Sequence, residues 1–169
     1  MDNKELYELY RLKNIVRYNT RPKITTESVA EHSFFVTVIA LELCDEYHID
    51  EATKQQILIK AMLHDMPEIE INDITYDAKE RLNLRPYLKK YEDDYYDRRF
   101  PKYSKLMKND EGLVQAIVDL ADAYSVLQYT IYEKELGNTS NEMQIIYDTT
   151  MERIENYRIK IQNLLGGKI

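Results

Sequence analysis

Hydrophobic residues recur at intervals of three and four along most of this chain. Such spacing places apolar side chains on one face of an α-helix, and it therefore predicts a series of amphipathic helices. The first is expected over about residues 4–18. A second is expected to begin at Ser28, because Ser28 and Glu31 have the spacing of a capping box. The stripe that this second helix would bury contains Val29, Ser33, Val36, Ala40, Leu43 and Tyr47, with His32 at its edge.

The middle of the chain predicts a helix over residues 51–63 that ends at His64 and Asp65. Pro67 is expected to begin the next helix, because proline fits a first turn but removes a hydrogen bond from a helix interior. Residues 87–107 are rich in tyrosine and charge, and their apolar spacing is less regular. We interpret these tyrosines as anchors over the core, with a partner-binding surface as the alternative.

The last third of the chain predicts two long helices. Residues 110–135 are apolar on more than one face, which is typical of a buried central helix. Asp122 lies inside this segment, where a buried aspartate without a partner is energetically costly. Gly137 should end the helix, and Thr139 with Glu142 should cap a final one that runs to about residue 165.

Glycine is absent from the first 111 residues of this 169-residue chain. This absence excludes phosphate-binding loops that need glycine there, and it leaves few of the tight turns that β-sheets require. Together with the helical spacing, it predicts an all-α fold. We expect a single domain over residues 1–169, because no linker or internal repeat interrupts the pattern.

Composition narrows the choice of function. The chain is 44% hydrophobic and 31% charged, as in soluble globular proteins, and its net charge of -7 argues against long nucleic acid as a partner. No apolar run approaches the roughly 18 residues of a membrane span, and the first residues lack the apolar part of a secretory signal. The one cysteine, Cys44, fits a buried core position. We therefore expect a cytoplasmic protein with no membrane partner.

Polar residues from three of the predicted helices suggest a metal site. His32 lies on the inner edge of one helix, His64 and Asp65 end another, and Asp122 lies within a third. Two imidazoles and two carboxylates suit Mn, Fe, Co or Zn better than Mg or Ca. The residues alone also fit a metal-free alternative: a capped helix end, a core histidine, and an aspartate that is hydrogen-bonded to the backbone.

A family resemblance decides between these alternatives. The segments VAEHS, LHDMPE and LADAY resemble the H…HD…D signature of the HD-domain phosphohydrolases, an all-α superfamily. IVRYNTRP before ESVAEHS, and HDMPEIEINDI with Asp73 eight residues after Asp65, resemble the small bacterial YfbR-like 5′-deoxynucleotidases. The resemblance covers most of the chain and is strongest over residues 11–80 and 115–130. It implies a single-domain helical bundle of the HD type.

The resemblance also implies a catalytic centre with one divalent transition metal ion (Mn, Co, Zn or Fe). The implied metal ligands are His32, His64, Asp65 and Asp122. Glu68 would act on the attacking water, and Asp73 would act at the substrate end. The chain has three histidines, and His48 is expected at an exposed helix end, so too few remain for a two-metal site.

Two residues before the second helix match substrate-binding positions of the same family. Arg17 matches an arginine near the phosphate. Tyr18 stands where relatives often have a tryptophan near the sugar, and this difference is expected to relax the selection for deoxyribose. Glu70 matches no functional position, and we interpret it as a solvated side chain.

The expected function is metal-dependent removal of the 5′-phosphate from deoxyribonucleoside monophosphates, by a homodimer like those of the family. One alternative keeps the fold and the metal but takes a dNTP and releases triphosphate, with Arg21 and Lys23 serving the longer phosphate chain. Another alternative is a non-catalytic nucleotide-binding module. An intact set of ligands together with Glu68 argues against that module.

Overall fold

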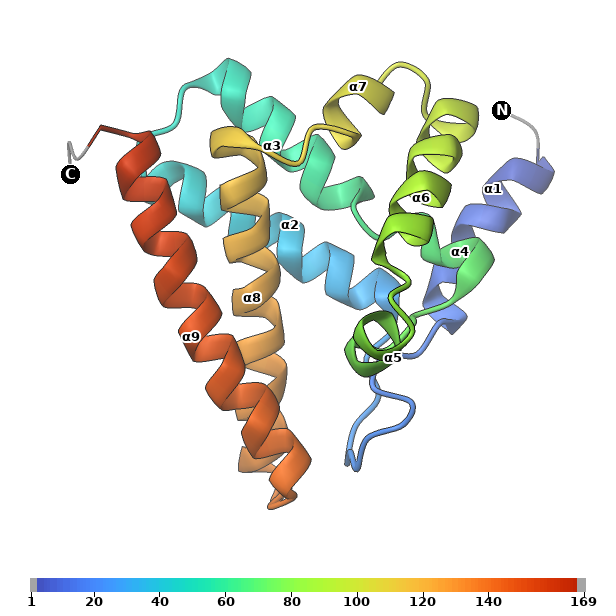
Figure 1. The fold of residues 1–169 in the computed structure, drawn as a ribbon, viewed down its shortest axis with the longest axis vertical. Helices are drawn as coiled ribbons and strands as arrows, with labels where there is room; N and C mark the ends of the chain where they lie inside the picture. The colour runs from blue at the N-terminus through green and yellow to red at the C-terminus, as the bar shows by residue number, and fades with distance from the viewer. Residues whose placement is uncertain (1–2, 167–169) are drawn as a thin grey trace.

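A computed structural model describes residues 3–166. The secondary-structure elements of this part of the chain are all helices (Figure 1). The all-α prediction is therefore confirmed. The helices are α1 (Asn3–Tyr10), the 3-10 helix η1 (Arg11–Asn14), α2 (Val29–Glu46), α3 (Glu51–Leu63), α4 (Glu68–Ile71), α5 (Tyr76–Arg81), α6 (Arg85–Arg99), α7 (Ser104–Met107), α8 (Gly112–Glu135) and α9 (Asn141–Leu164).

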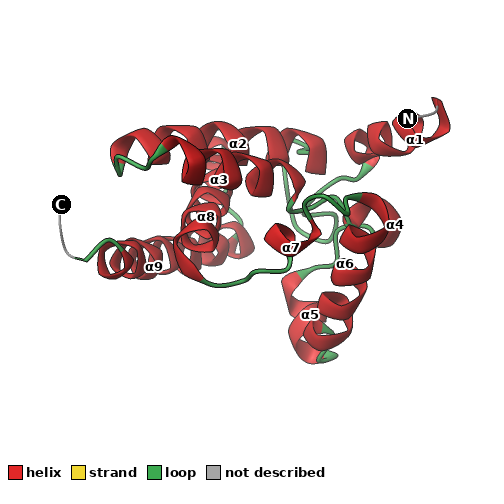
Figure 2. Ribbon diagram, turned by 90° about the horizontal axis from the view of Figure 1, so that it is seen from above, coloured by secondary structure: helices red, strands yellow, loops and turns green. Residues whose placement is uncertain are grey.

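The core forms around α8, which packs against α2, α3 and α9. Figure 2 shows α8 between α2 and α3 on one side and α9 on the other. The predicted stripe of α2 is buried throughout, and so is Cys44. Burial raises the pKa of the Cys44 thiol to about 11, as expected for an inert core residue. Residues at the centre of this core include Val36, Ala40, Ile57, Ala61, Ile117, Leu120, Ala121 and Ile161.

The first predicted helix ends earlier than its apolar spacing suggests. Helical structure stops at Asn14, and Val16 instead forms an antiparallel bridge with Ser28. Ile15 and Val16 are adjacent β-branched residues, which favour an extended backbone over a helix. The Ser28 capping box, which is formed as predicted, ends this bridged segment and starts α2. Residues Arg17 and Tyr18 consequently lie in a loop rather than on a helix.

Residues 87–107 are more regular than predicted. Most of them belong to α6, which has Pro86 in its first turn. This helix buries only Tyr95 and Tyr96, and such a narrow apolar face hides the helical period in the sequence. The prediction that these tyrosines anchor the core is confirmed for this pair, whereas Tyr87 is exposed.

Two helix boundaries can be compared with their predicted residues. The cap of α9 is Ser140, whose hydroxyl accepts from the backbone N–H of Met143, so the prediction of Thr139 was wrong by one residue. The prediction that His48 is exposed at a helix end is confirmed.

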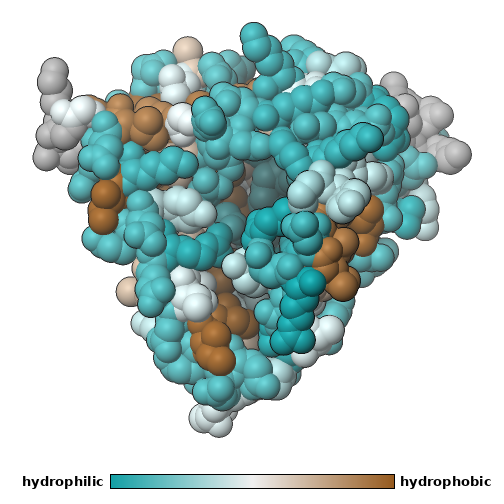
Figure 3. All heavy atoms as spheres, in the orientation of Figure 1, coloured by the Kyte–Doolittle hydropathy of each residue, from teal (hydrophilic) through white to brown (hydrophobic). Residues whose placement is uncertain are grey.

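None of the described helices is long and apolar enough to cross a membrane. Figure 3 shows a mainly hydrophilic face with separate apolar areas.

Candidate metal and nucleotide site

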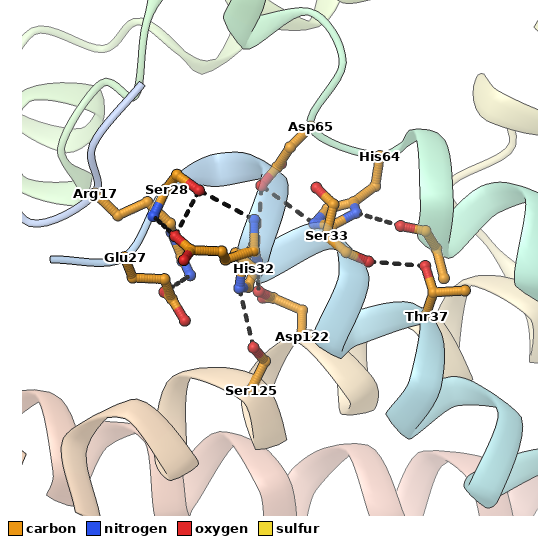
Figure 4. A network of polar contacts seen from close by, with 12 residues as sticks. Arg17, Glu27, Ser28, His32, Ser33, Thr37, His64, Asp65, Asp122 and Ser125 are labelled. Carbon is orange, nitrogen blue, oxygen red and sulfur yellow. Dashed lines mark hydrogen bonds and ion pairs between the residues drawn. The ribbon is translucent and has the colours of Figure 1, made fainter. Parts of the chain in front are cut away.

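Four of the predicted site residues come together where α2, the end of α3 and α8 meet (Figure 4). His32 Nε2 lies 3.1 Å from Asp122 Oδ1 and 3.7 Å from Asp65 Oδ2. His64 Nε2 lies 3.2 Å from the same Asp65 oxygen. One ligand atom from each of His32, His64 and Asp65 lies within 4.8 Å of the other two, so one ion can contact all three.

The two histidines present free nitrogens to this cluster. His64 Nδ1 donates to the Ala61 carbonyl over 2.7 Å, and His32 Nδ1 lies 3.1 Å from the Ser125 hydroxyl. Their Nε2 atoms are buried and have no hydrogen-bond partner. Outer hydrogen bonds of this kind fix the imidazole so that the inner nitrogen can offer its lone pair to a metal. The donor set therefore fits a divalent transition metal.

Both aspartates carry negative charge at neutral pH. Burial raises the pKa of Asp65, but the neighbouring His64 and His32 outweigh this effect and hold the pKa well below its usual range. Burial also raises the pKa of Asp122, and His32 and Arg17 outweigh it there. Two carboxylates at this point can offset the charge of a divalent ion.

Asp122 is less enclosed than the sequence suggests. Its side chain is 27% exposed, and its Oδ2 accepts a hydrogen bond from Arg153 of α9 over 3.2 Å. The helix is buried as predicted, but at this residue its surface faces the site instead of the core. In the described part of the chain, the carboxylate lies against the His32 imidazole and accepts a hydrogen bond from the Arg153 side chain. The metal-free alternative, which needs a backbone partner, therefore finds no support at Asp122.

Glu68 begins α4, and Pro67 occupies its N-cap position, which confirms that a helix starts shortly after the His64–Asp65 doublet. The Oε2 of Glu68 is buried and has no hydrogen-bond partner. Burial, together with the charges of Asp65 and Asp73, raises the pKa of Glu68 to about 9. A carboxyl group with a raised pKa is a stronger base once ionised, which suits proton transfer from water. Asp73 lies in a half-buried loop after α4.

Two further charged residues line the same cavity beside the doublet: Lys79 of α5 and Glu92 of α6 share it with His64, Asp65 and Glu68. Burial raises the pKa of Glu92, and the charge of Lys79 opposes this rise. Neither residue was predicted as part of the site. No sequence motif marks them, because they come together only in the folded chain, where residues of α4, α5 and α6 line one cavity.

Arg17 lies in the loop between η1 and α2, beside the candidate metal cluster formed by His32, His64, Asp65 and Asp122 (called the metal cluster below). Its Nη1 donates to Glu27 Oε2 over 2.8 Å, and its backbone N–H donates to the Glu27 carbonyl over 2.9 Å. Its charge is near enough to contribute to the lowered pKa values of Asp65 and Asp122. The guanidinium is thus held by Glu27 on one side, and its positive charge acts on Asp65 and Asp122 on the other.

Tyr18 is held by stacking. Its ring lies 4.6 Å from that of Tyr129, centroid to centroid, with the planes at 3°. The Tyr18 hydroxyl is buried without a hydrogen-bond partner, and burial raises the pKa of Tyr18 to about 12. Its backbone has φ +56°, a left-handed conformation that is uncommon for tyrosine. A phenol held in this way is a rigid neutral surface at neutral pH.

Residues of α6 hold the doublet and the helix that follows it. The buried Tyr96 hydroxyl lies 2.9 Å from the Leu63 carbonyl and 2.7 Å from the His64 carbonyl, and it donates toward both. These carbonyls lie at the end of α3, where the helix itself supplies no donor. Glu70 is exposed as predicted, but it is not simply solvated, because Arg98 and Tyr91 of α6 donate to it.

Comparisons with known proteins agree with this geometry. A sequence model of the YfbR-like 5′-deoxynucleotidase family matches residues 6–164. The 4′-phosphooxetanocin A phosphatase of Priestia megaterium is 23% identical over 141 residues, which are 77% of this chain and 73% of that protein. The crystal structure of an HD-domain phosphohydrolase from Listeria innocua is 28% identical, with a TM-score of 0.76 over 92% of this chain and 80% of that chain. A cyanophage S-2L HD phosphohydrolase, solved with dA and one catalytic Zn²⁺, is 17% identical, with a TM-score of 0.73 over 92% and 83% of the two chains.

Proposed function

The chain belongs to the YfbR-like 5′-deoxynucleotidase family, and on that premise we propose that it removes the 5′-phosphate from deoxyribonucleoside monophosphates with one divalent transition metal ion. It is a nucleotide phosphohydrolase of the HD-domain type. The observation that most supports the finer proposal is a pair of buried, unpartnered histidine nitrogens beside Asp65, with the unpartnered Glu68 carboxyl group on the wall of a cavity that His64 and Asp65 also line.

The residues that would hold the ion are His32, His64, Asp65 and Asp122. When bound, a divalent ion supplies Lewis acidity toward water and a phosphoryl oxygen. Mn, Co, Zn and Fe all accept this mixture of imidazole and carboxylate ligands. The protein's own part is to hold the two imidazoles by their outer nitrogens, at Ser125 and at the Ala61 carbonyl.

Proton transfer falls to the carboxyl groups around the cavity. Glu68 would take a proton from the water that attacks phosphorus, while the bond from phosphorus to the 5′-oxygen breaks and inorganic phosphate and the nucleoside form. The departing 5′-oxygen needs a proton. Asp73 lies close enough to Glu68 and Tyr18 to raise both of their pKa values. We therefore assign Asp73 to the sugar end, where it would pass the proton that Glu68 has taken from water to the departing 5′-oxygen.

Substrate binding is assigned to Arg17 and Tyr18. Arg17 would bind phosphate oxygens with the part of its guanidinium that Glu27 leaves free, and so stabilise charge that develops there. Tyr18 already stacks on Tyr129, so the edge of its ring and its free hydroxyl are what remain for the sugar.

The surroundings of Arg17 favour a monophosphate over a triphosphate. Arg21, which could have served a longer phosphate chain, pairs with Asp77 of α5. Lys23 Nζ donates to the Arg17 carbonyl over 2.9 Å. Both cations therefore already have partners in the protein, and a dNTP could use them only by breaking these contacts.

The substrate class can be tested with dAMP, AMP and dATP under one set of conditions, with products separated by chromatography. We expect phosphate and deoxyadenosine from dAMP, and no triphosphate from dATP. AMP should react more slowly by roughly tenfold to two-hundredfold, since a contact of the size of the Tyr18 ring discriminates by only about 1–3 kcal/mol. Triphosphate from dATP with dAMP inert would show that the alternative reaction is correct. No turnover of any nucleotide would favour the binding module.

We also propose a homodimer. The tyrosines of residues 87–103 give little support, because Tyr95 and Tyr96 are buried. Exposed apolar side chains instead gather on α2, at Phe34, Phe35, Val38 and Leu41. Contiguous apolar surface of this kind often marks an interface. Light scattering at tens of micromolar should give about twice the chain mass of 20.2 kDa, and a monomer mass would contradict the proposal.

A further inference from the structure

The loop from Tyr18 to Thr26 is closed at its base and fastened at its far side to α8. At the base, Val16 bridges to Ser28. At the far side, Glu133 Oε2 accepts from the Ile24 backbone N–H over 2.8 Å, and Glu133 Oε1 accepts from the Thr25 backbone N–H and hydroxyl over 2.7 and 2.6 Å. One side chain of α8 thus receives three hydrogen bonds from a segment more than 100 residues away in the sequence.

Glu133 is a completely buried carboxylate, with a relative exposure of 0%. Asn138, which follows α8, donates to its Oε2 over 2.7 Å and also to the Pro22 carbonyl over 3.0 Å. Burial alone would raise the pKa of Glu133, but the donors outweigh it and lower the pKa to about 2. Burial of an ionised carboxylate is costly, so its four donors must compensate for lost water. None of those donors belongs to the metal cluster.

The same face of α8 holds the rest of the site. Asp122, Ser125, Tyr129 and Glu133 follow one another at intervals of three and four, which places them in one row along the helix. Asp122 and Ser125 contact His32 at the metal end. Tyr129 stacks on Tyr18, and its hydroxyl donates to the Thr25 carbonyl over 3.2 Å. The row therefore joins the metal cluster to the loop.

Arg17 depends on both arms of this loop. Its guanidinium is fixed by Glu27, just after the segment that Glu133 holds, and its carbonyl is bound by Lys23, just before that segment. We propose, on the basis of the proposed function, that Glu133 is a positioning residue. It would hold Arg17 and Tyr18 at the distance from the metal cluster that binding of a nucleotide phosphate requires. Glu133 touches no substrate itself and acts through the loop.

The test is Glu133→Gln, with Glu135→Gln as its matched control. Glutamine keeps the size of Glu133, but its NH2 group would face N–H donors and could not accept from them. Glu135 is exposed on the same helix end, so its variant should behave as wild type. For Glu133→Gln we expect the KM for dAMP and the Kd for inorganic phosphate, measured by calorimetry on the metal-loaded protein, to rise at least about tenfold. Metal content should be unchanged, and the loss in kcat should be smaller than the rise in KM, because Glu133 touches none of the reacting atoms.

A double-variant cycle with Arg17→Ala separates positioning from stability. If Glu133 acts through Arg17, the double variant should bind phosphate as weakly as Arg17→Ala alone. Additive losses would overturn the proposal, as would a lowered melting temperature with unchanged phosphate affinity. If Glu133→Gln does not fold, Thr25→Val removes one hydrogen bond and should give a smaller loss of the same kind; unchanged phosphate affinity in this variant would equally overturn the proposal. Phosphate binding needs no turnover, so an inactive wild type would count against the proposed function and leave this test intact.

Discussion

Replacing Glu68 with glutamine is expected to lower kcat for dAMP by at least about 100-fold while leaving the metal content of the protein unchanged. Glutamine preserves the shape of the side chain but cannot take a proton from water. General acid–base catalysis usually contributes about 10²–10⁴ in rate, and the loss should fall in that range. Steady-state kinetics combined with elemental analysis measures both quantities on the same sample.

The position of Glu68 explains why the two effects should separate. It stands at the first residue of α4, just beyond the doublet, and its Oε2 is buried without a partner. Glu70→Gln is a suitable control, since Glu70 lies on the same short helix but is exposed and bonded to α6. Wild-type turnover in Glu68→Gln would refute its role as the base. Loss of the metal along with turnover would instead make Glu68 a ligand.

Replacing His64 with alanine is expected to remove the ion and reduce phosphate release to background. Loss of an outer partner of a metal ligand typically costs 10–100-fold in metal affinity, so loss of the ligand itself should cost more than about 100-fold. The variant should also lose the thermal stabilisation that added Mn²⁺ or Zn²⁺ gives to the folded protein, because an ion that binds only the folded state raises its stability.

His48→Ala provides the matched control for this experiment. His48 is exposed beyond α2, away from the cluster, so its loss should change neither metal content nor turnover. Elemental analysis of both variants after gel filtration decides the matter. Equal metal content in His64→Ala and His48→Ala would show that the ion, if any, is held elsewhere.

The sequence predicted the parts of the fold that are determined by a local pattern of residues. The Ser28–Glu31 pair fixed the start of α2, and the apolar stripe fixed its buried face. The chemistry of residues on three separate predicted helices suggested a metal site, and the resemblance to the HD-domain phosphohydrolases implied that His32, His64, Asp65 and Asp122 share it. The structure brings these four together, and their roles as metal ligands stay a prediction.

Other parts could not be predicted because they depend on contacts between distant segments. Val16 leaves the helical pattern to pair with Ser28, and the apolar spacing of residues 4–18 gives no sign of this. Lys79 reaches the cavity only because of how α5 is placed. Glu133 could have been suspected, since it continues the row that begins at Asp122, but its partners at Ile24 and Thr25 could not.

The central claim is that this chain hydrolyses the phosphate ester of a deoxyribonucleoside monophosphate and needs a divalent ion to do so. The most direct measurement is phosphate release from dAMP by metal-depleted protein as Mn²⁺, Co²⁺ or Zn²⁺ is titrated back. We predict no release without an ion, then a rise that saturates near one ion per chain, with deoxyadenosine formed in equal amount. Release that does not depend on the added ion, or none with any of the three, would contradict the claim.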